Sequence, residues 1–268
     1  MLRKGTFILM KTKIQDMTSG SPGRLIILFA IPLMLGNICQ QLYTMVDTMV
    51  VGQVAGVEAL AALGAVDFLM WVVTGISTGL TQGFSIQLSQ YYGAKDFENL
   101  RKSLAHSYRL TAFIAAGVLI LSQSFASLVL TGLHTPSNII GMSLLYLRII
   151  FCGIPATAAY NMFASALRAM GNSKTPLTAM IIASVLNVSL DILFVAGFGW
   201  GVAGAAIATV IAQSFSAVYC FLILRRIDIV HLTRADFMPA SGMNARLMKL
   251  GIPVVFQNII CLLYTSPS

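Results

Sequence analysis

Long runs of apolar residues, separated by short charged segments, dominate the chain. The first run lies between Arg24 and Asp47 and holds 22 uncharged residues. An α-helix rises about 1.5 Å per residue and the hydrocarbon core of a bilayer is about 30 Å thick, so a run of this length can cross it. The pattern therefore predicts membrane-spanning helices.

Five more apolar runs of similar character follow, and a seventh begins near Leu250. The five cover residues 68–94, 110–130, 139–167, 175–195 and 202–224. The polar stretch at 131–138, which contains Pro136, is typical of a turn between two spans. We therefore expect an all-α membrane protein, with a six-helix transmembrane bundle and the start of a seventh helix.

The composition agrees with a membrane protein and excludes an ordinary soluble domain. Hydrophobic residues make up 57% of the 268 residues and charged residues only 10%, against roughly 25% charged in a typical soluble domain. The net charge of +8 does not indicate a nucleic-acid partner, because the basic residues fall into short clusters between the spans rather than along one patch.

The distribution of basic residues predicts the orientation. Of the 17 Lys and Arg residues, 16 lie before the first span or after the second, fourth and sixth. The remaining one, Arg148, lies within the fourth span. Basic residues collect on the cytoplasmic side of membrane proteins, so both ends of the six-span unit are expected to face the cytoplasm.

A short internal repeat suggests two similar lobes. The Ile-Pro pair at 31–32 is followed by Asn37, and the Ile-Pro pair at 252–253 by Asn258, at a constant offset of 221 residues. Transporters built from two repeated halves show such self-similarity. The predicted organisation is a cytoplasmic tail, a six-helix lobe, a cytoplasmic linker and the truncated start of a second lobe. These four parts cover residues 1–22, 23–226, 227–248 and 249–268, respectively.

Two acidic residues inside apolar runs are the main functional candidates, because ionisable groups are costly in a membrane. Asp191 lies about 24 Å into the fifth span, with Asn187 one turn earlier on the same face. Asp47 closes the first span, and two interpretations stay open for it: a solvated helix end or a group within the bundle. Asp191 is either a functional group or a structural hydrogen-bonding partner.

Other polar residues are expected at similar depth in the outer half of the bundle. Gln40 lies two turns below Asp47, while Tyr146 and Thr209 belong to the fourth and sixth spans. A pair of carboxylates there could bind a proton, since burial favours the neutral acid, or a small hard cation that prefers oxygen ligands. Arg148 is either a counter-charge to the acids or an anchor at the membrane interface.

Small residues and prolines predict how the helices pack and bend. Gly75, Gly79 and Gly83 form a ladder of small residues, which is typical of close helix packing in membranes. Pro155 removes a backbone hydrogen bond and favours a kink.

No catalytic pattern is evident. The four cysteines lack metal-ligand spacing, the three histidines lie at or near predicted loops and are expected to be solvated, and no nucleotide-binding motif is present. We expect neither an enzyme nor a resident cofactor.

Several segments resemble the MATE (multidrug and toxic compound extrusion) family, in its DinF-like prokaryotic branch. The arginine-containing loop combined with Asn-x-x-x-Asp is the most specific part. The matching segments are AIPLM at 30–34, QQLY at 40–43, DT at 47–48, YLRIIFCGIP at 146–155, LRAMGNSKTP at 167–176, NVSLD at 187–191 and GAAIAT at 204–209.

The resemblance implies a twelve-helix antiporter of two six-helix lobes, with this chain supplying the N-terminal lobe. It would exchange H⁺ or Na⁺ for organic, often cationic, compounds by alternating access. The implied coupling site, with a possible Na⁺, is Asp47, Asn187, Asp191 and Thr209. The implied supporting polar network or substrate cavity is Gln40, Tyr146, Arg148 and Asn161. Some members have an Asn where this chain has Ala164, which leaves part of that network open.

The resemblance also implies a location and partners. We expect a multi-pass protein of the prokaryotic plasma (inner) membrane with a cytoplasmic N-terminus. The partners would be small organic cations, membrane lipid and a missing C-terminal lobe of the same chain. Two alternatives stay open. One is a related flippase for lipid-linked oligosaccharides, although such a cavity tends to carry several cations. The other is a membrane scaffold that does not depend on Asp47 or Asp191.

Overall fold

The computed structural model describes residues 21–238 and 242–265, and the predicted tail at 1–22 therefore lies almost wholly outside the described residues. The described parts are helical throughout. They form α1 (Pro22–Val54), α2 (Val57–Gly93), α3 (Phe97–Gly132), α4 (Ile140–Cys152), α5 (Ile154–Ala169), α6 (Lys174–Asp191), α7 (Gly201–Leu224) and α8 (Met243–Thr265). A π-helical turn, η1 (Ile192–Gly197), continues α6, and two 3₁₀ turns, η2 (Asp228–Val230) and η3 (Arg234–Phe237), precede α8.

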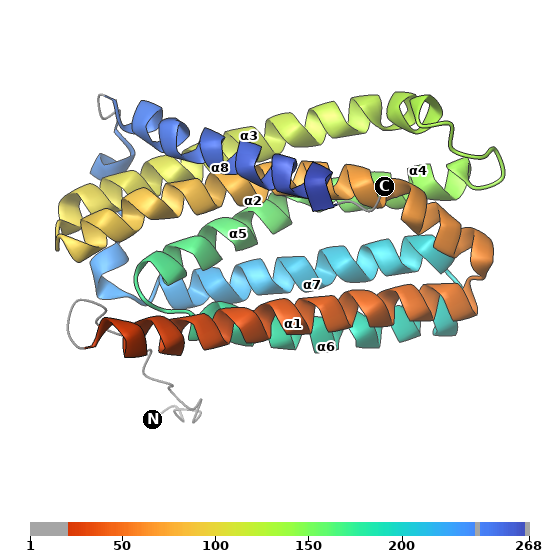
Figure 1. Cartoon of the computed structure of the whole chain (residues 1–268), viewed down its shortest axis with the longest axis horizontal. Helices are drawn as coiled ribbons and strands as arrows, with labels where there is room; N and C mark the ends of the chain where they lie inside the picture. The colour runs from red at the N-terminus through yellow and green to blue at the C-terminus, as the bar shows by residue number, and fades with distance from the viewer. Residues whose placement is uncertain (1–20, 239–241, 266–268) are drawn as a thin grey trace, which may run out of the picture.

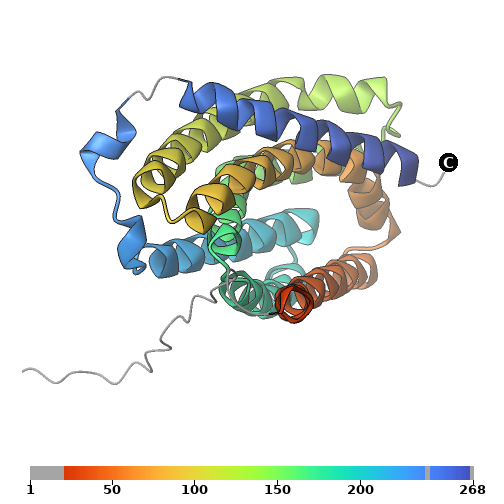
Figure 2. The same cartoon turned by 60° about the vertical axis from the view of Figure 1, so that its left-hand side comes forward.

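The helices form two groups with α5 between them. Figures 1 and 2 show α1, α6 and α7 on one side and α2, α3 and α8 on the other. Helix α5 packs against α2 and α3 and also against α7 and α6, so it connects the two groups. Helices α1 and α6 lie side by side along most of their length, which brings the first and fifth predicted spans together.

The membrane prediction is confirmed by the lengths and composition of the helices. Five of the described helices are long and apolar enough to cross a bilayer, and α4 with α5 makes a sixth if the bent pair counts as one span. The two halves of that pair are bent by 46° at Gly153, and Pro155 lies in the first turn of α5. The predicted kink is therefore present, and it has the expected cause.

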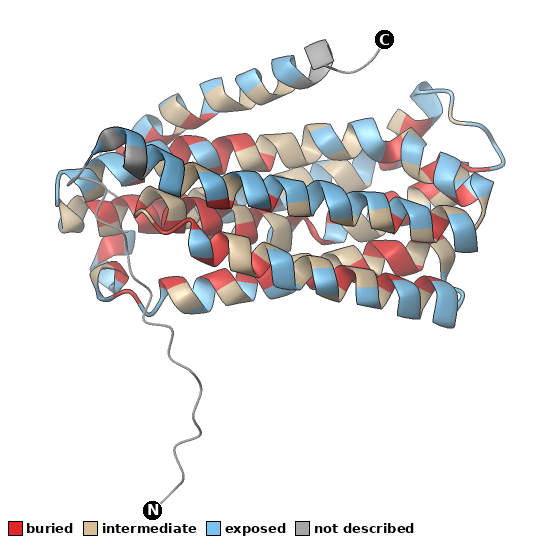
Figure 3. Cartoon of the chain, turned by 60° about the horizontal axis from the view of Figure 1, so that its bottom comes forward, coloured by how far each residue is buried: buried red, intermediate tan, exposed pale blue. Residues whose placement is uncertain are grey.

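The outer surface of the bundle is apolar, as a lipid environment requires. Figure 3 shows exposed residues along the outward faces of the helices and buried ones between them. Phe113 and Leu128 on α3 and Val185 on α6 are each about two-thirds exposed. An exposed apolar surface of this extent marks contact with lipid or with another protein unit.

Helix α1 is longer than the sequence pattern indicates. It continues past Asp47 to Val54 and ends where Gly56 adopts a positive φ of 92°. Asp47 is 7% exposed, so its interpretation as a solvated helix end is wrong. The physical reason is that a buried polar contact, described below, holds the charged residue inside the bundle instead of ending the helix at it.

The loop between α5 and α6 is a tight helix–helix turn. Gly171 has φ 81°, and the amide of Asn172 donates to the Leu167 carbonyl at 2.9 Å, which together make a glycine-based helix C-cap. The Asn172 side chain then accepts from the Thr175 amide at 3.0 Å and caps the start of α6. Part of the family-like segment at 167–176 is thus explained by turn geometry alone.

Helix α8 packs against α2 at backbone distance. A Cβ atom added at Gly83 would lie 2.4 Å from the Cα of Gly251, and one at Gly79 would lie 2.7 Å from the Cα of Val255. The predicted glycine ladder therefore does pack closely at these two positions. Gly75, in contrast, has nothing within 4 Å of such a Cβ, so the ladder is used only in part.

The segment before α8 is held against α3. His106 is 2% exposed, and its ring nitrogens lie 2.7 Å from Asn244 Oδ1 and 3.1 Å from the Met238 carbonyl oxygen. Arg109 donates to the Phe237 carbonyl at 3.2 Å. The expectation that the histidines are solvated is wrong for His106, because the chain between α7 and α8 folds back over α3 and covers it.

A carboxylate helps to order this segment. Burial raises the pKa of Asp236, but hydrogen bonds from the amide and hydroxyl of Thr233, at 2.7 and 2.8 Å, together with Arg101 and Lys102, hold it below its usual value. Asp236 is therefore ionised at neutral pH and caps the turn η3.

The close contact between α2 and α8 predicts that a side chain added at Gly83 lowers the stability of the protein. Gly83→Ala should destabilise the protein by about 1–3 kcal/mol, because the added methyl overlaps the α8 backbone and forces the helices apart. Thermal unfolding of the purified protein in detergent measures this. Gly75→Ala is the matched control and should be neutral or stabilising by up to about 1 kcal/mol, the gain in helix propensity. Equal melting temperatures for the two variants would show that the close approach does not exist.

Candidate functional site

Two carboxyl groups meet inside the bundle. Asp47 projects from α1 and Asp191 from the last turn of α6, and they are 7% and 0% exposed. Their side chains lie within hydrogen-bonding reach of each other. The two acidic candidates from the sequence are thus brought together by the pairing of α1 with α6.

Contact between two buried carboxyl groups restricts their ionisation. Repulsion between unit charges about 4 Å apart is on the order of 4 kcal/mol at an effective dielectric constant of about 20. Two touching carboxylates must therefore share a proton or hold a cation between them. One oxygen of each group, Oδ1 of Asp47 and Oδ1 of Asp191, is buried without a hydrogen-bond partner among the described residues.

Asn187 and Thr209 complete the polar group around Asp191. Asn187 is 1% exposed and lies one turn before Asp191 on α6. In one orientation of its amide, Nδ2 donates to Thr209 Oγ1 at 3.4 Å. In the other, Nδ2 donates to Asp191 Oδ2 at 3.2 Å and Oδ1 accepts from the Thr209 amide at 3.3 Å. The second orientation satisfies both ends of the amide and links α6 to α7.

A change of helix type follows Asp191 directly. The α-helical pattern of α6 ends at Asp191 and the π-helical turn η1 begins at Ile192. Such π turns are uncommon and occur frequently at functional sites. The sequence pattern predicts one regular helix here and gives no signal for this turn.

Two tyrosines surround the carboxyl pair. Tyr146 of α4 is 5% exposed and lies within electrostatic range of Asp47 and Asp191. Tyr43 lies one turn before Asp47 on α1 and interacts with both carboxyl groups as well. Sequence reasoning names Tyr146 but not Tyr43 as a site residue, although the spacing of four residues from Asp47 could have indicated it.

A cavity between α1, α5, α6 and α7 reaches Asn187 and Thr209, the polar neighbours of Asp191, although neither carboxyl group is among its lining residues. Its volume is about 40 Å³, and because a buried water needs roughly 10–15 Å³ by the same measure, a few water molecules fit. Gln40, one of the candidates from the sequence, lines it. The lining residues are Gln40, Tyr43, Tyr160, Met180, Ala183, Ser184, Asn187, Thr209, Ala212, Gln213 and Ser216. Sequence reasoning missed Tyr160, Ser184 and Gln213, because nothing in a single apolar run shows which face meets a neighbouring helix.

The structure does not bring Asn161 or Arg148 to the carboxyl pair. Asn161 Nδ2 donates to Thr78 Oγ1 at 3.2 Å and so connects α5 to α2. Arg148 is exposed and forms no ion pair among the described residues. Its carbonyl oxygen accepts from Gln123 Nε2 at 2.8 Å. The counter-charge interpretation of Arg148 therefore gains no support from the geometry.

The residues present suit a proton or a small hard cation. Within the described ranges, no group of three or more His, Cys, Asp or Glu side chains is placed to hold a metal ion. The two carboxylates and the Thr209 hydroxyl are oxygen donors of the kind that hard cations prefer, and Asn187 adds its amide oxygen only in the first of its two orientations. The unpartnered Oδ1 atoms of Asp47 and Asp191 are available to such a cation or to a proton.

The chain is similar in sequence to known multidrug transport proteins. The family model described as MatE matches residues 32–193. A probable multidrug resistance protein, YpnP of Bacillus subtilis, is 31% identical over 92% of this chain and 56% of its own length. The multidrug export protein MepA of Staphylococcus saprophyticus is 22% identical over 87% of this chain and 52% of its own length. The chain spans about half the length of the curated relatives it matches.

Solved structures show the same architecture. A MOP superfamily transporter from Pyrococcus furiosus superposes with a TM-score of 0.86 at 26% identity, over 92% of this chain and 55% of the transporter. A MATE protein crystallised in complex with MaD3S gives a TM-score of 0.85 at 26% identity, over 92% of this chain and 56% of that protein. The bundle described above therefore matches the N-terminal half of known transporter structures.

The close pairing of Asp47 with Asp191 predicts that removing one of the two charges raises the stability of the protein. Asp191→Asn should stabilise the protein in alkaline buffer by about 1 kcal/mol or more, because it removes one of two like charges held in contact. For a domain of this size the melting temperature should rise by roughly 2–4 °C. Asp67→Asn, which neutralises an exposed carboxylate on α2, is the control and should leave the melting temperature unchanged. A loss of stability specific to Asp191→Asn would contradict the close pairing.

Proposed function

Because this chain belongs to the MatE family, we propose that it forms the first lobe of a cation-coupled antiporter that exports organic, mainly cationic, compounds. The coupling ion would be H⁺ or Na⁺, and transport would proceed by alternating access. The names of the relatives, multidrug resistance and multidrug export proteins, support the export of drugs.

One observation carries the proposal: the carboxyl groups of Asp47 and Asp191 lie within hydrogen-bonding reach of each other inside the bundle. A buried pair of carboxyl groups is costly, and ionisable groups within membrane spans are functional candidates by default. The pair binds its ion from one side of the membrane and releases it to the other. A scaffold would gain nothing from this arrangement.

The coupling follows from differential binding. An ion between Asp47 and Asp191 neutralises them and draws α1 and α6 together, whereas its loss leaves two charges that repel. A ligand shifts a conformational equilibrium only by binding one state more tightly than the other. Helix α1 is the natural moving part, because it contains Pro32 and packs chiefly against α6.

The charge of the interior supports cationic substrates. The buried carboxyl groups Asp47 and Asp191 lie near one end of the cavity, where Tyr43 offers an aromatic face that attracts organic cations. The cation Arg168 acts at the other end, on Tyr160. A lipid-pyrophosphate flippase would need several cations in the cavity. Arg148, the cation inside a predicted span, is exposed and apart from the cavity.

Several finer assignments belong to the same proposal. The acidic residues in α1 and α6 support the DinF-like branch, and the distribution of basic residues supports a cytoplasmic N-terminus in the prokaryotic inner membrane. Helix α8 would be the first helix of the second lobe, and residues 227–248 would be the connection between lobes. Lipid and that second lobe would cover the exposed apolar faces.

The test uses the gene's complete product in a drug-sensitive bacterial host. Asp191→Asn should abolish energy-dependent efflux of a fluorescent cationic dye, because the neutral pair no longer binds and releases the coupling ion. Dye retention is measured by fluorescence, and expression by immunoblot of membranes.

Asp67→Asn is the matched control, since it changes the same functional group on the exposed side of α2. It should export dye at the wild-type rate. Unchanged efflux in Asp191→Asn, at normal expression, would overturn the proposed function.

A further inference from the structure

The cavity beside the carboxyl pair extends toward the basic end of the lobe. One end is lined by Asn187 and Thr209, which also belong to the carboxyl site, and the other by Tyr160 and Ser216. On α7, Thr209 and Ser216 are two turns apart, about 10 Å along the helix axis. The helix then continues to Leu224 and is followed by Arg225 and Arg226.

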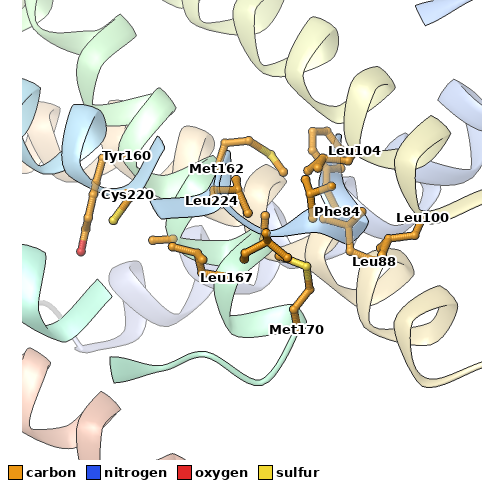
Figure 4. Close-up of a cluster of buried hydrophobic side chains, with 14 of the residues drawn as sticks. Phe84, Leu88, Leu100, Leu104, Tyr160, Met162, Leu167, Met170, Cys220 and Leu224 are labelled. Atoms are coloured by element: carbon orange, nitrogen blue, oxygen red, sulfur yellow. The ribbon is translucent and has the colours of Figure 1, made fainter. Parts of the chain in front are cut away.

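Two polar groups in the cavity wall are buried without partners. The Tyr160 hydroxyl and Gln213 Oε1 make no hydrogen bond to any described residue, and Tyr160 as a whole is 8% exposed. Buried polar atoms are rarely left unpaired, and when they are, a water or an ion usually explains them. Figure 4 shows the Tyr160 hydroxyl directed away from the apolar cluster around Met162 and Leu167.

The serines of the cavity cannot satisfy these groups. Ser184 donates to the Met180 carbonyl at 2.9 Å, and Ser216 donates to the Ala212 carbonyl at 3.2 Å. Both hydroxyl protons are thus committed to the helix backbone, and the serine oxygens remain only as acceptors. The wall therefore offers a row of oxygen atoms as acceptors to water. At the end of the cavity away from Asn187, the Tyr160 hydroxyl adds a proton donor.

We propose that Tyr160 and Gln213 hold a short chain of water molecules that carries the coupling proton between the Asp47–Asp191 pair and the basic end of the lobe. This inference rests on the proposed function and deepens it, because it commits to H⁺ as the coupling ion. Tyr160 is a positioning and relay residue, since it acts on the carboxyl pair through water.

The transfer conserves atoms and charge. A proton leaves the carboxyl group of Asp191 for the nearest water, and that water passes one of its own protons along the chain. When the lobe admits water beyond Tyr160, the tyrosine oxygen accepts a proton from the chain as its hydroxyl gives one to that water, so the side chain ends neutral and Asp191 is left as a carboxylate. The net result is the movement of one proton by about two helical turns.

The surroundings of Tyr160 favour a proton over Na⁺. The titratable groups that act on it electrostatically are Cys220 of α7, Arg168 of α5 and Tyr43 of α1. The positive charge of Arg168, whose Nη2 donates to Ser165 Oγ at 3.1 Å, repels a metal cation at this end of the cavity. An excess proton carries the same charge and meets the same repulsion, but it moves by exchange between fixed oxygens and does not have to travel through the cavity as an ion with its own shell of ligands.

Tyr160 and Cys220 stand at the edge of an apolar cluster to which they themselves belong. It includes Leu167 and Leu224, which are almost fully buried. In this conformation the water chain therefore ends at Tyr160, and the cluster prevents a continuous proton leak across the lobe.

The experiment uses the gene's complete product in proteoliposomes. Tyr160→Phe removes the hydroxyl and keeps the ring, so dye efflux driven by a pH gradient should slow by roughly tenfold or more, as when a positioned proton-transfer group is lost. Dye–dye exchange without a gradient, which needs no net proton movement, should keep its rate. Tyr108→Phe is the control, because Tyr108 packs on Phe163 away from the cavity, and both rates should stay at the wild-type level.

Each other outcome overturns the inference. An unchanged driven rate in Tyr160→Phe would show that the hydroxyl carries no proton, and an equal loss of driven efflux and exchange would show a purely structural role. Efflux driven by Na⁺ without any proton flux would also exclude the relay. Asp191→Asn, run in parallel, separates the two proposals, because loss of its driven efflux keeps the proposed function standing when the relay fails.

Discussion

The contact between two carboxyl groups in an apolar bundle is the constraint on which the rest of the structure depends. Asp47 and Asp191 cannot both carry a charge at this distance without an ion between them. The site therefore has two states of different net charge, and each state favours a different spacing of α1 and α6. Asn187 and Thr209 hold Asp191 from α6 and α7, so in the proposed mechanism α1 would be the helix that moves. In the proposed antiporter, the energetic cost of this contact would be the source of coupling.

The remainder of the fold keeps this costly site in place. Helix α5 connects the two helix groups and supplies Tyr160 to the cavity. On the opposite side, the glycine contact at Gly83 joins α2 to α8 at backbone distance, and the buried His106 ties the segment before α8 to α3. The close contacts of Gly83 and His106 thus lie away from the carboxyl pair. They would not restrict the proposed movement of α1.

Much of the architecture could be predicted from the sequence, because membrane spans depend on length and hydropathy, which are local properties. The bend at Pro155 and the pairing of Asn187 with Asp191 also follow from spacing within one helix. Contacts between helices could not be predicted in this way. Tyr160 could not be identified from the sequence, because its place in the cavity depends on how four helices pack. The prediction for His106 was wrong because the residues that bury it lie more than 100 positions away in the chain.

The most direct test of the central claim is to count the protons that the carboxyl pair binds. Infrared difference spectroscopy between acidic and alkaline pH, on the purified protein in lipid, detects the carbonyl band of a protonated carboxyl group. The account predicts that Asp47 and Asp191 titrate as one coupled unit, so replacing either residue by Asn shifts or removes the band of the other. Two independent bands, each unaffected by replacement of the other residue, would contradict a shared site.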